Sequence, residues 1–381
     1  MDDLKRIVGA YDPDAPLERA WTIPSEWYTE PGVAALEERT VFSSSWQVVG
    51  RAGQVARPGC YITDSIAREP ILVVRGDDGR LRGFFNVCRH HAAAVMTEPE
   101  GAATNLRCPY HGWTYGLDGR LRGTPDFAGV CDFDRGAHGL IELAVSEWEQ
   151  FVFVRLDPQG PSLEEFLGED LRAQIALLRL DGFQFMERRR YAFECNWKVF
   201  VDNYLDGGYH IPHLHKGLDS VLDYAEYSIC NGERHCLQKS PVTSRGAEPV
   251  TGAVRRGSLA LYYWLYPNFM INWYDGVMDC NLVRPLGLDR TEVIFDFYFP
   301  DVSSAEARAR NTASIAVGQR IQDEDTAICR SVQQGLRSRA YRQGRLSVRR
   351  EAGEHLFHRL LHADLKRGLE EGTTRTAASK P

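Results

Sequence analysis

Two short segments of this sequence each place a cysteine close to a histidine, in a pattern that suits metal binding. One residue separates Cys88 from His90, two separate Cys108 from His111, and seventeen lie between the pairs. Structural zinc sites usually draw their cysteines from one loop and their histidines from a helix. Mixed pairs instead indicate a [2Fe–2S] cluster in which two thiolates bind one iron and two imidazoles bind the other, which raises its reduction potential. We predict that these four residues hold such a cluster, which accepts electrons from a ferredoxin-type donor.

The sequence around the second pair carries a family resemblance. Residues 108–119, CPYHGWTYGLDG, resemble the second cluster loop of the Rieske oxygenases almost letter for letter. Asp118-Gly119 is typical of a tight hairpin turn, so we expect the cluster loops on a small antiparallel β domain. His91 follows His90 but lies outside the cysteine-x-histidine spacing. We therefore expect His91 to be a polar neighbour of the cluster and not a ligand.

The composition indicates a globular protein without a nucleic-acid or membrane partner. The 381 residues carry a formal net charge of −7, and no basic stripe is evident, which argues against nucleic-acid binding. The nine cysteines follow no disulfide rhythm, which is typical of a reducing compartment. The N-terminus lacks the pattern of a signal peptide, and the most apolar stretch, 259–274, is interrupted by Pro267. We predict a cytoplasmic protein.

Turn residues and hydrophobic periodicity divide the chain into two domains. A helix capped by Ser162 is expected over 163–180, and a long helix is expected from about Ser304 to Leu336. The predicted fold class is α+β, with an all-β Rieske domain and a catalytic domain whose antiparallel sheet wraps around the long C-terminal helix. The expected segments are a catalytic-domain arm at 1–41, the Rieske domain at 42–160, the catalytic domain at 161–365 and a mobile tail at 366–381.

A second group of metal-binding side chains lies in the segment that begins at Asp202. It contains Asp206, His210, His213 and His215, and so dense a cluster more often binds a metal than serves packing. Non-heme iron oxygenases need two imidazoles and one carboxylate on one face of Fe(II), with open positions for O2. The Rieske oxygenases that this sequence resembles hold their iron through H-x4-H. The resemblance implies His210 and His215 as ligands and leaves His213 outside the set.

The third ligand of that iron is expected on the long helix, which offers Asp323, Glu324 and Asp325. A helical wheel at about 100° per residue places Asp325 nearest the centre of the apolar stripe and Asp323 opposite. A carboxylate on a buried stripe needs a compensating charge, from a ferrous ion or from Arg320 or Arg330. The resemblance implies the second residue of the Glu-Asp pair, Asp325. The apolar stripe consists of Val317, Ile321, Ile328, Val332 and Leu336.

Asp206 is the candidate for carrying electrons between the two metal centres. In the family that the sequence resembles, an acidic residue before the first histidine ligand links the cluster of one subunit to the iron of its neighbour. The resemblance therefore implies a homotrimer or a multiple of it. The usual position, three residues before the histidine, is Gly207 here, and Asp206 stands one residue earlier. The alternative is an aspartate that only bonds the backbone at a helix end.

A resemblance to the choline monooxygenase branch sets the expected function. It implies the oxygenase component of a multicomponent system that uses O2 at Fe(II) to hydroxylate a small molecule, with oxidation or N-demethylation of a quaternary or tertiary amine as the main expectation. The chain lacks a Gly-x-Gly-x-x-Gly turn and a ferredoxin motif, so electrons from NAD(P)H require a separate ferredoxin or flavin reductase. The resemblance rests on the segments 203–210, 262–272, 278–283 and 357–362.

Other interpretations stay open on the sequence alone. An aromatic-ring hydroxylating dioxygenase alpha subunit uses the same two metal sites, and a Rieske electron carrier needs only the first. The aromatic residues of 262–272 can hold a quaternary ammonium group by cation–π attraction, although aromatic runs are also typical of sheet packing. Trp273 stands where that branch has a basic residue, which indicates a changed pocket. For His355, His358 and His362, which share helical spacing, we favour helix packing over a further metal site.

Overall fold

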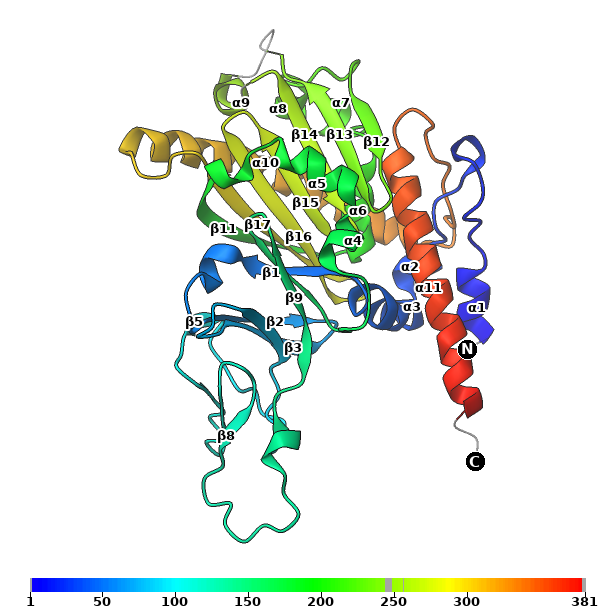
Figure 1. Cartoon of the computed structure of the whole chain (residues 1–381). Helices are drawn as coiled ribbons and strands as arrows, with labels where there is room; N and C mark the ends of the chain where they lie inside the picture. Colours follow the sequence, from blue (N-terminus) through cyan, green and yellow to red (C-terminus); the bar gives the residue numbers. More distant parts are fainter. Residues whose placement is uncertain (1, 244–248, 256, 379–381) are drawn as a thin grey trace. The chain divides into compact units, whose positions relative to one another are not determined.

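The computed structural model describes residues 2–243, 249–255 and 257–378 (Figure 1). The chain forms two compact units: the continuous segment Phe42–Phe166, and Met1–Val41 together with Leu167–Pro381. We call them the cluster unit and the catalytic unit. The N-terminal arm therefore packs with the C-terminal half, and the cluster unit ends at Phe166, a few residues beyond the expected boundary at 160.

The cluster unit is built from antiparallel strands. Its larger sheet has seven strands in the order β1-β10-β9-β4-β3-β2-β5, and a smaller sheet has the order β6-β7-β8. Gly119 adopts a φ of +77° in the turn between β7 and β8, which explains why glycine follows aspartate there. The strands are β1 Gln47–Arg51, β2 Cys60–Ile66, β3 Glu69–Arg75, β4 Leu81–Phe85, β5 Glu100–Ala102, β6 Leu106–Arg107, β7 Thr114–Tyr115, β8 Leu121–Gly123, β9 Glu142–Trp148 and β10 Phe151–Arg155, with 3₁₀ turns at Ala52–Val55 and Arg135–His138.

The catalytic unit contains a seven-stranded antiparallel sheet in the order β11-β17-β16-β15-β14-β13-β12. Its strands are β11 Gln184–Phe193, β12 Ser228–Asn231, β13 His235–Pro241, β14 Leu259–Leu265, β15 Phe269–Tyr274, β16 Val277–Gly287 and β17 Arg290–Phe299. The helices are α1 Asp2–Val8, α2 Glu26–Thr29, α3 Pro31–Glu37, α5 Glu169–Ala176, α6 Trp197–Leu205, α7 Ile211–Leu214, α8 Lys216–Asp219, α9 Pro249–Val254, α10 Ala305–Leu336 and α11 Ala352–Ala378, with a π turn at Glu38–Phe42 and 3₁₀ turns at Leu17–Arg19 and Leu180–Gly182.

The long helix α10 is the element that positions the carboxylate candidates. It begins after Ser304, whose side-chain oxygen accepts a hydrogen bond from the amide of Ala307 at 3.2 Å, as expected for an N-cap. It packs against α6 and α9 and contacts strand β11. The predicted α+β class, with an all-β unit and an antiparallel sheet paired with a long C-terminal helix, is confirmed.

Two expectations about helices were wrong. The helix predicted over 163–180 breaks at Gly168 into α4 (Leu163–Leu167) and α5. Gly168 has a φ of +76°, which lies outside the helical region and which glycine adopts without steric cost. The tail expected from residue 366 is instead part of α11, which continues to Ala378 and buries Leu369. Residues 379–381 lie outside the described residues.

Among the described residues, no helix combines the length and the apolar character that a membrane crossing would require.

Candidate metal centres and the adjoining pocket

The two cysteines of the cluster motif lie on loops of the cluster unit, one after β4 and one after β6. Both are buried, with Cys88 at 3% and Cys108 at 2% exposure. The amide of Cys108 donates to the carbonyl of Trp113, and the amide of Gly112, at a φ of +71°, donates back to the carbonyl of Cys108. Burial raises the pKa of the Cys108 thiol, so a thiolate there requires nearby positive charge, which a cluster iron supplies.

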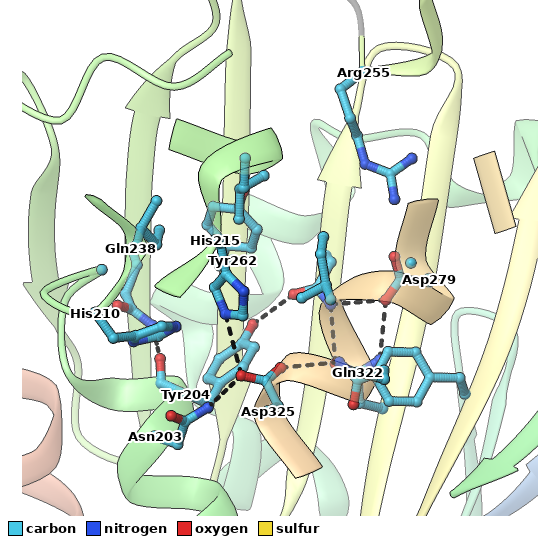
Figure 2. Close-up of a pocket in the computed structure, with 18 of the residues that line it drawn as sticks. Asn203, Tyr204, His210, His215, Gln238, Arg255, Tyr262, Asp279, Gln322 and Asp325 are labelled. Atoms are coloured by element: carbon cyan, nitrogen blue, oxygen red, sulfur yellow. Dashed lines mark hydrogen bonds and ion pairs between the residues drawn. The ribbon is translucent and has the colours of Figure 1, made fainter. Parts of the chain in front are cut away.

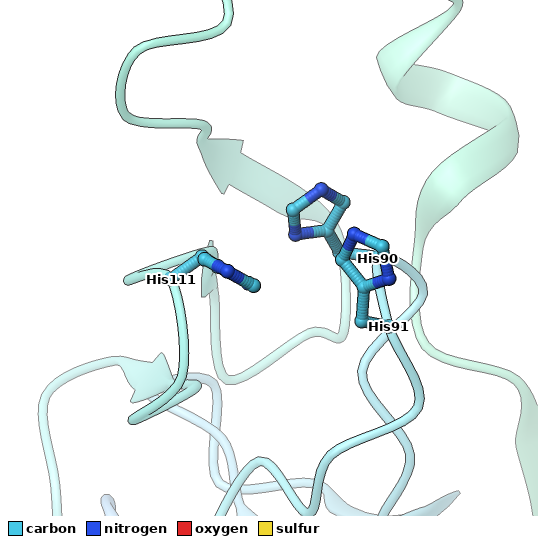
Figure 3. A group of neighbouring side chains, drawn as sticks. All are labelled: His90, His91 and His111. Carbon is cyan, nitrogen blue, oxygen red and sulfur yellow. The ribbon is translucent and has the colours of Figure 1, made fainter.

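The histidines of the two motifs converge beside these loops (Figure 3). Ligand atoms of His90, His91 and His111 lie within 4.8 Å of one another. Distance therefore does not separate His90 from His91, but burial does. Among the described residues, Nδ1 of His90 is buried without a hydrogen-bond partner while its ring stacks on Trp113 at 4.6 Å, whereas His91 is exposed. A buried imidazole nitrogen without a hydrogen-bond partner fits the role of a metal ligand.

The second motif begins at the C-terminal end of α6. Gly207 and Gly208 follow with φ of +65° and +69°, and a Cβ on Gly207 would lie 2.0 Å from the carbonyl oxygen of Arg350. Only glycine fits this turn. The turn delivers His210 to the start of the short helix α7, and His215 follows its end.

These two histidines meet Asp325 from α10. The candidate ligand atoms of His210, His215 and Asp325 lie within 4.8 Å of one another, and Nε2 of His215 is 3.1 Å from Oδ1 of Asp325. Figure 2 shows the three side chains at one side of a pocket. Asp325 is 5% exposed and His215 is 2% exposed. His213, by contrast, is exposed and does not line this pocket.

Carboxylates orient both imidazole rings. Nδ1 of His210 is 2.5 Å from Oδ2 of Asp206, and Nδ1 of His215 is 2.6 Å from Oε2 of Glu324. Because each Nδ1 is occupied, each Nε2 is left for a metal, the arrangement that metal-binding histidines usually show. Burial would lower the pKa of His215, but its contacts with Asp325 and Glu324 outweigh burial and raise it.

Glu324 is a site residue that the sequence interpretation missed. The sequence offered Glu324 only as an alternative to Asp325 as an iron ligand, and not as a partner of a histidine ring. Its position next to Asp325 was the available signal, because two neighbouring carboxylates can contact the same histidine ring. Glu324 contacts Nδ1 of His215, and Asp325 contacts Nε2. Asp325 itself accepts hydrogen bonds from Asn203 at 3.0 Å and from Gln322 at 3.2 Å, which hold its carboxylate toward the histidines.

The pocket beside these ligands has a volume of about 110 Å³. Its charged lining residues are Asp325, Asp279 and Arg255. Asp279 accepts hydrogen bonds from the side-chain amides of Asn272 at 2.7 Å and Asn281 at 2.9 Å. Burial raises the pKa of Asp279, and Arg255 opposes that rise. The aromatic lining residues are Phe200, Tyr204, Tyr227, Tyr262, Tyr274 and Phe295.

A third group of potential ligands lies on the α11 side of α6 and consists of Asp202, Glu354 and His358. Nε2 of His358 is 3.0 Å from Asp202, which also accepts a hydrogen bond from Tyr28 at 2.6 Å. His362 stacks on Trp27 with ring centroids 6.3 Å apart. These contacts join α11 to α6 and to the N-terminal arm, in keeping with the packing role favoured for these histidines.

Comparisons with known proteins identify both units. The Rieske [2Fe-2S] domain family matches residues 45–134, and the ring hydroxylating alpha subunit (catalytic domain) family matches residues 180–366. Chloroplastic choline monooxygenase of Arabidopsis thaliana is 39% identical, covering 96% of this chain and 88% of that protein. The carnitine monooxygenase oxygenase subunit of Escherichia coli K12 is 32% identical, covering 90% and 94%.

Solved structures agree. A quaternary ammonium Rieske monooxygenase in complex with its substrate L-carnitine has a TM-score of 0.79 and 28% identity, covering 93% of this chain and 96% of that one. Naphthalene 1,2-dioxygenase from Rhodococcus sp., at 20% identity and a TM-score of 0.76, shares the fold. A pure electron carrier would lack the catalytic domain. The chain is an oxidoreductase that belongs to the Rieske oxygenases, in the branch that includes the choline and carnitine monooxygenases.

Proposed function

We propose that this protein is the oxygenase component of a multicomponent system that oxidises a quaternary or tertiary amine. His210, His215 and Asp325 would hold a mononuclear Fe(II), and Cys88, His90, Cys108 and His111 would hold the [2Fe–2S] cluster. The observation that carries the iron assignment is the orientation of both imidazoles, whose Nδ1 atoms contact Asp206 and Glu324. Two imidazoles and one carboxylate leave positions open for O2.

The pocket supports an amine substrate. Aromatic faces attract quaternary ammonium groups, and four tyrosines line the cavity together with the buried carboxylate of Asp279. The relatives named for choline and carnitine act on quaternary ammonium compounds, and the chain covers most of their length. The cationic group would lie among the tyrosines, with one of its carbon atoms directed toward His210, His215 and Asp325.

The overall reaction balances as R–H + O2 + 2e⁻ + 2H⁺ → R–OH + H2O. Iron at this site, when bound, supplies the activation of O2. The protein's own contribution is to orient the substrate, to keep the site largely free of water, and to hold Asp325 in place through Asn203 and Gln322. Hydroxylation of a carbon attached to nitrogen gives a carbinolamine, which breaks down to an aldehyde and an amine.

Electron supply is the next part of the proposal. A separate ferredoxin or flavin reductase would reduce the cluster with electrons from NAD(P)H, and the protein would act as a homotrimer or a multiple of it. Asp206 contacts the ring of His210 and also accepts hydrogen bonds from the amides of Tyr209 and His210. It is therefore bonded to the candidate iron ligand, as an electron bridge requires, while it also caps the turn.

The test is O2 consumption by the iron-loaded protein with a reductase, across choline, betaines, carnitine and small aromatics. We expect trimethylammonium compounds to stimulate O2 uptake with formation of an aldehyde and an amine or alcohol. Stimulation by arenes alone, with a cis-diol as product, would overturn the proposal in favour of a ring-hydroxylating dioxygenase. For Asp206→Asn, reconstituted to full iron content, we expect slower oxidation of the pre-reduced cluster in a single turnover.

A further inference from the structure

The turn that leads to the proposed iron ligand His210 contains two consecutive glycines. Gly207 and Gly208 have φ of +65° and +69°, and glycine has more conformational freedom to lose than any other residue. Asp206 stands directly before them, and its Oδ2 is nevertheless 2.5 Å from Nδ1 of His210. Because the turn itself is intrinsically flexible, groups outside it must hold these two side chains together.

Arg350, which lies just before α11, contacts this turn with both its backbone and its side chain. A Cβ on Gly207 would lie 2.0 Å from the carbonyl oxygen of Arg350, so the two backbones are in direct contact. The side chain returns to the same glycine, because Nη1 donates a long hydrogen bond of 3.5 Å to the carbonyl of Gly207. Nη2 donates to the carbonyl of Tyr224 at 2.9 Å. The guanidinium therefore links the turn to the segment between α8 and β12.

The guanidinium of Arg350 is fixed in place by its burial. Arg350 is 2% exposed, and among the described residues it forms no ion pair. Its charge lies 3.8 Å from the ring centroid of Tyr224 and 5.8 Å from that of Tyr227. Burying a cation is costly unless hydrogen bonds and aromatic faces replace its water. Because any movement would break these contacts, Arg350 can act as a rigid support for the turn.

The charge of Arg350 also lies within electrostatic range of Asp206. Burial raises the pKa of Tyr227, Asp206 raises it further, and Arg350 opposes the rise. Both charged groups are therefore close enough to act on one hydroxyl, and their opposite charges attract each other. A Cβ on Gly208 would lie 2.9 Å from Cε2 of Tyr227. The ring that Arg350 faces thus packs against the second glycine, while Arg350 itself holds the first.

We propose that Arg350 is a positioning residue for electron transfer to the iron site, and that it holds the turn at Gly207 so that Asp206 keeps its contact with His210. This inference rests on the proposed role of Asp206 as electron bridge and adds the group that supports that bridge. Arg350 does not line the pocket, and its hydrogen bonds go to backbone carbonyls and not to the proposed iron ligands. It therefore acts through the turn alone.

A double-mutant cycle tests this inference. Iron affinity is measured by competition with a chelator, and oxidation of the pre-reduced cluster is followed in a single turnover of proteins reconstituted to full iron content. For Arg350→Ala we expect both quantities to fall by roughly 3- to 10-fold, because His210 and its partner lose their support. The combined variant with Asp206→Asn should lie within about twofold of Asp206→Asn alone, because both changes act on the same contact.

Neighbouring and conservative substitutions serve as controls. Arg349→Ala is the matched control, because Arg349 is exposed and donates only to the carbonyl of Ala225, at 3.4 Å, in the described contacts. Both quantities should stay within about twofold of the wild-type values. Arg350→Lys should show a loss of about threefold, because an ammonium group can reach one carbonyl but cannot reproduce the planar fork and its stacking. Thermal unfolding reports whether each variant is folded.

Two results would overturn the inference. The first is wild-type iron affinity and wild-type cluster oxidation in a folded Arg350→Ala protein. The second is full multiplication of the two losses in the combined variant, which is the result expected from general destabilisation. If Arg350→Ala does not fold, wild-type values for Arg350→Lys would overturn it instead. If the wild-type protein oxidises no amine, the proposed function fails, and the cycle of iron affinities still decides the role of Arg350.

Discussion

The two candidate metal centres differ in how far apart their ligands lie in the sequence and in how exposed they are. The cluster ligands fall between positions 88 and 111, and His111 is exposed although both thiols are buried. The iron ligands come from a turn after α6 and from α10, and His215 and Asp325 are 2% and 5% exposed. An exposed imidazole suits electron exchange with another protein, whereas a buried carboxylate suits a reaction shielded from water. The cluster site is local in sequence, and the iron site depends on the whole catalytic unit.

The strongest test of this comparison removes one centre and leaves the other. For His210→Ala we expect turnover to fall by at least about 100-fold, because a ligand is lost and not merely its hydrogen-bonding partner. The visible and EPR spectra of the cluster should be unchanged. His213→Ala, an exposed neighbour, should retain near-normal turnover. Normal turnover by His210→Ala with its cluster intact would contradict the oxygenase assignment.

The converse substitution acts on the cluster. For His90→Ala we expect cluster content, measured as acid-labile sulfide per chain, to drop by roughly tenfold, because a proposed cluster ligand is lost, one whose ring stacks on Trp113. Thermal unfolding of the isolated variant would show whether the fold survives. His91→Ala, which changes the exposed neighbour, should keep the cluster. Loss of the cluster in His91→Ala but not in His90→Ala would exchange their roles.

A smaller effect is expected from Glu324, which contacts the ring of a proposed iron ligand but is not itself a proposed ligand. Glu324→Gln removes the negative charge that orients His215 through Nδ1, so we expect iron affinity to decrease by about 10-fold. Competition with a chelator measures this affinity. Asp323→Asn is the control, because Asp323 is exposed on the same helix and bonds only to Gln319 in the described contacts. Equal affinities for the two variants would remove Glu324 from the site.

The smallest effect concerns stability and pH. Burial raises the pKa of Glu354 well above 4.5, and Asp202 adds to the rise, so the folded protein keeps a proton that the unfolded chain releases. The associated stability is present below the unfolded pKa and is lost as pH rises toward the folded pKa. Glu354→Gln should therefore raise Tm more at pH 8 than at pH 4.5. Each kcal/mol gained in the free energy of unfolding corresponds to a rise in Tm of roughly 2–4 °C. Glu371→Gln, an exposed change on α11, should show no such difference, and a larger gain at pH 4.5 would contradict the sign.

Local features were predictable from the sequence because they depend on neighbouring residues. The spacing of Cys88 and His90 and the start of the long helix near Ser304 both rest on a few adjacent positions. The structure brings Asp325 to the histidines as the helical wheel and the family resemblance indicated. The break at Gly168 was not predicted, because the same glycine could also have ended the helix or been tolerated within it.

The predictions that failed concern features that depend on residues far away in the sequence. The apolar stripe of α10 was partly wrong, since Ile328 and Val332 are 38% and 43% exposed while Ser314 and Gln322 are buried. A helix that lines a polar pocket buries polar side chains, and hydrophobic periodicity cannot indicate that. Arg255 gave no sequence signal for the same reason. Its position in the pocket follows from its place at the end of α9, which packs against α10, and from its contact with Ser314.

The catalytic unit consists of two segments that the cluster unit separates in the sequence. This arrangement has a consequence for the order in which the two units fold. Glu37, which is made early, accepts buried hydrogen bonds from Trp197 and Lys198, and α1 packs against α11, which is made after α10. The cluster unit is continuous and can fold as soon as it leaves the ribosome. The N-terminal arm cannot complete its packing before α11 has been made, and His210, His215 and Asp325 cannot come together before α10 has been made. We therefore expect the catalytic unit to fold after the cluster unit.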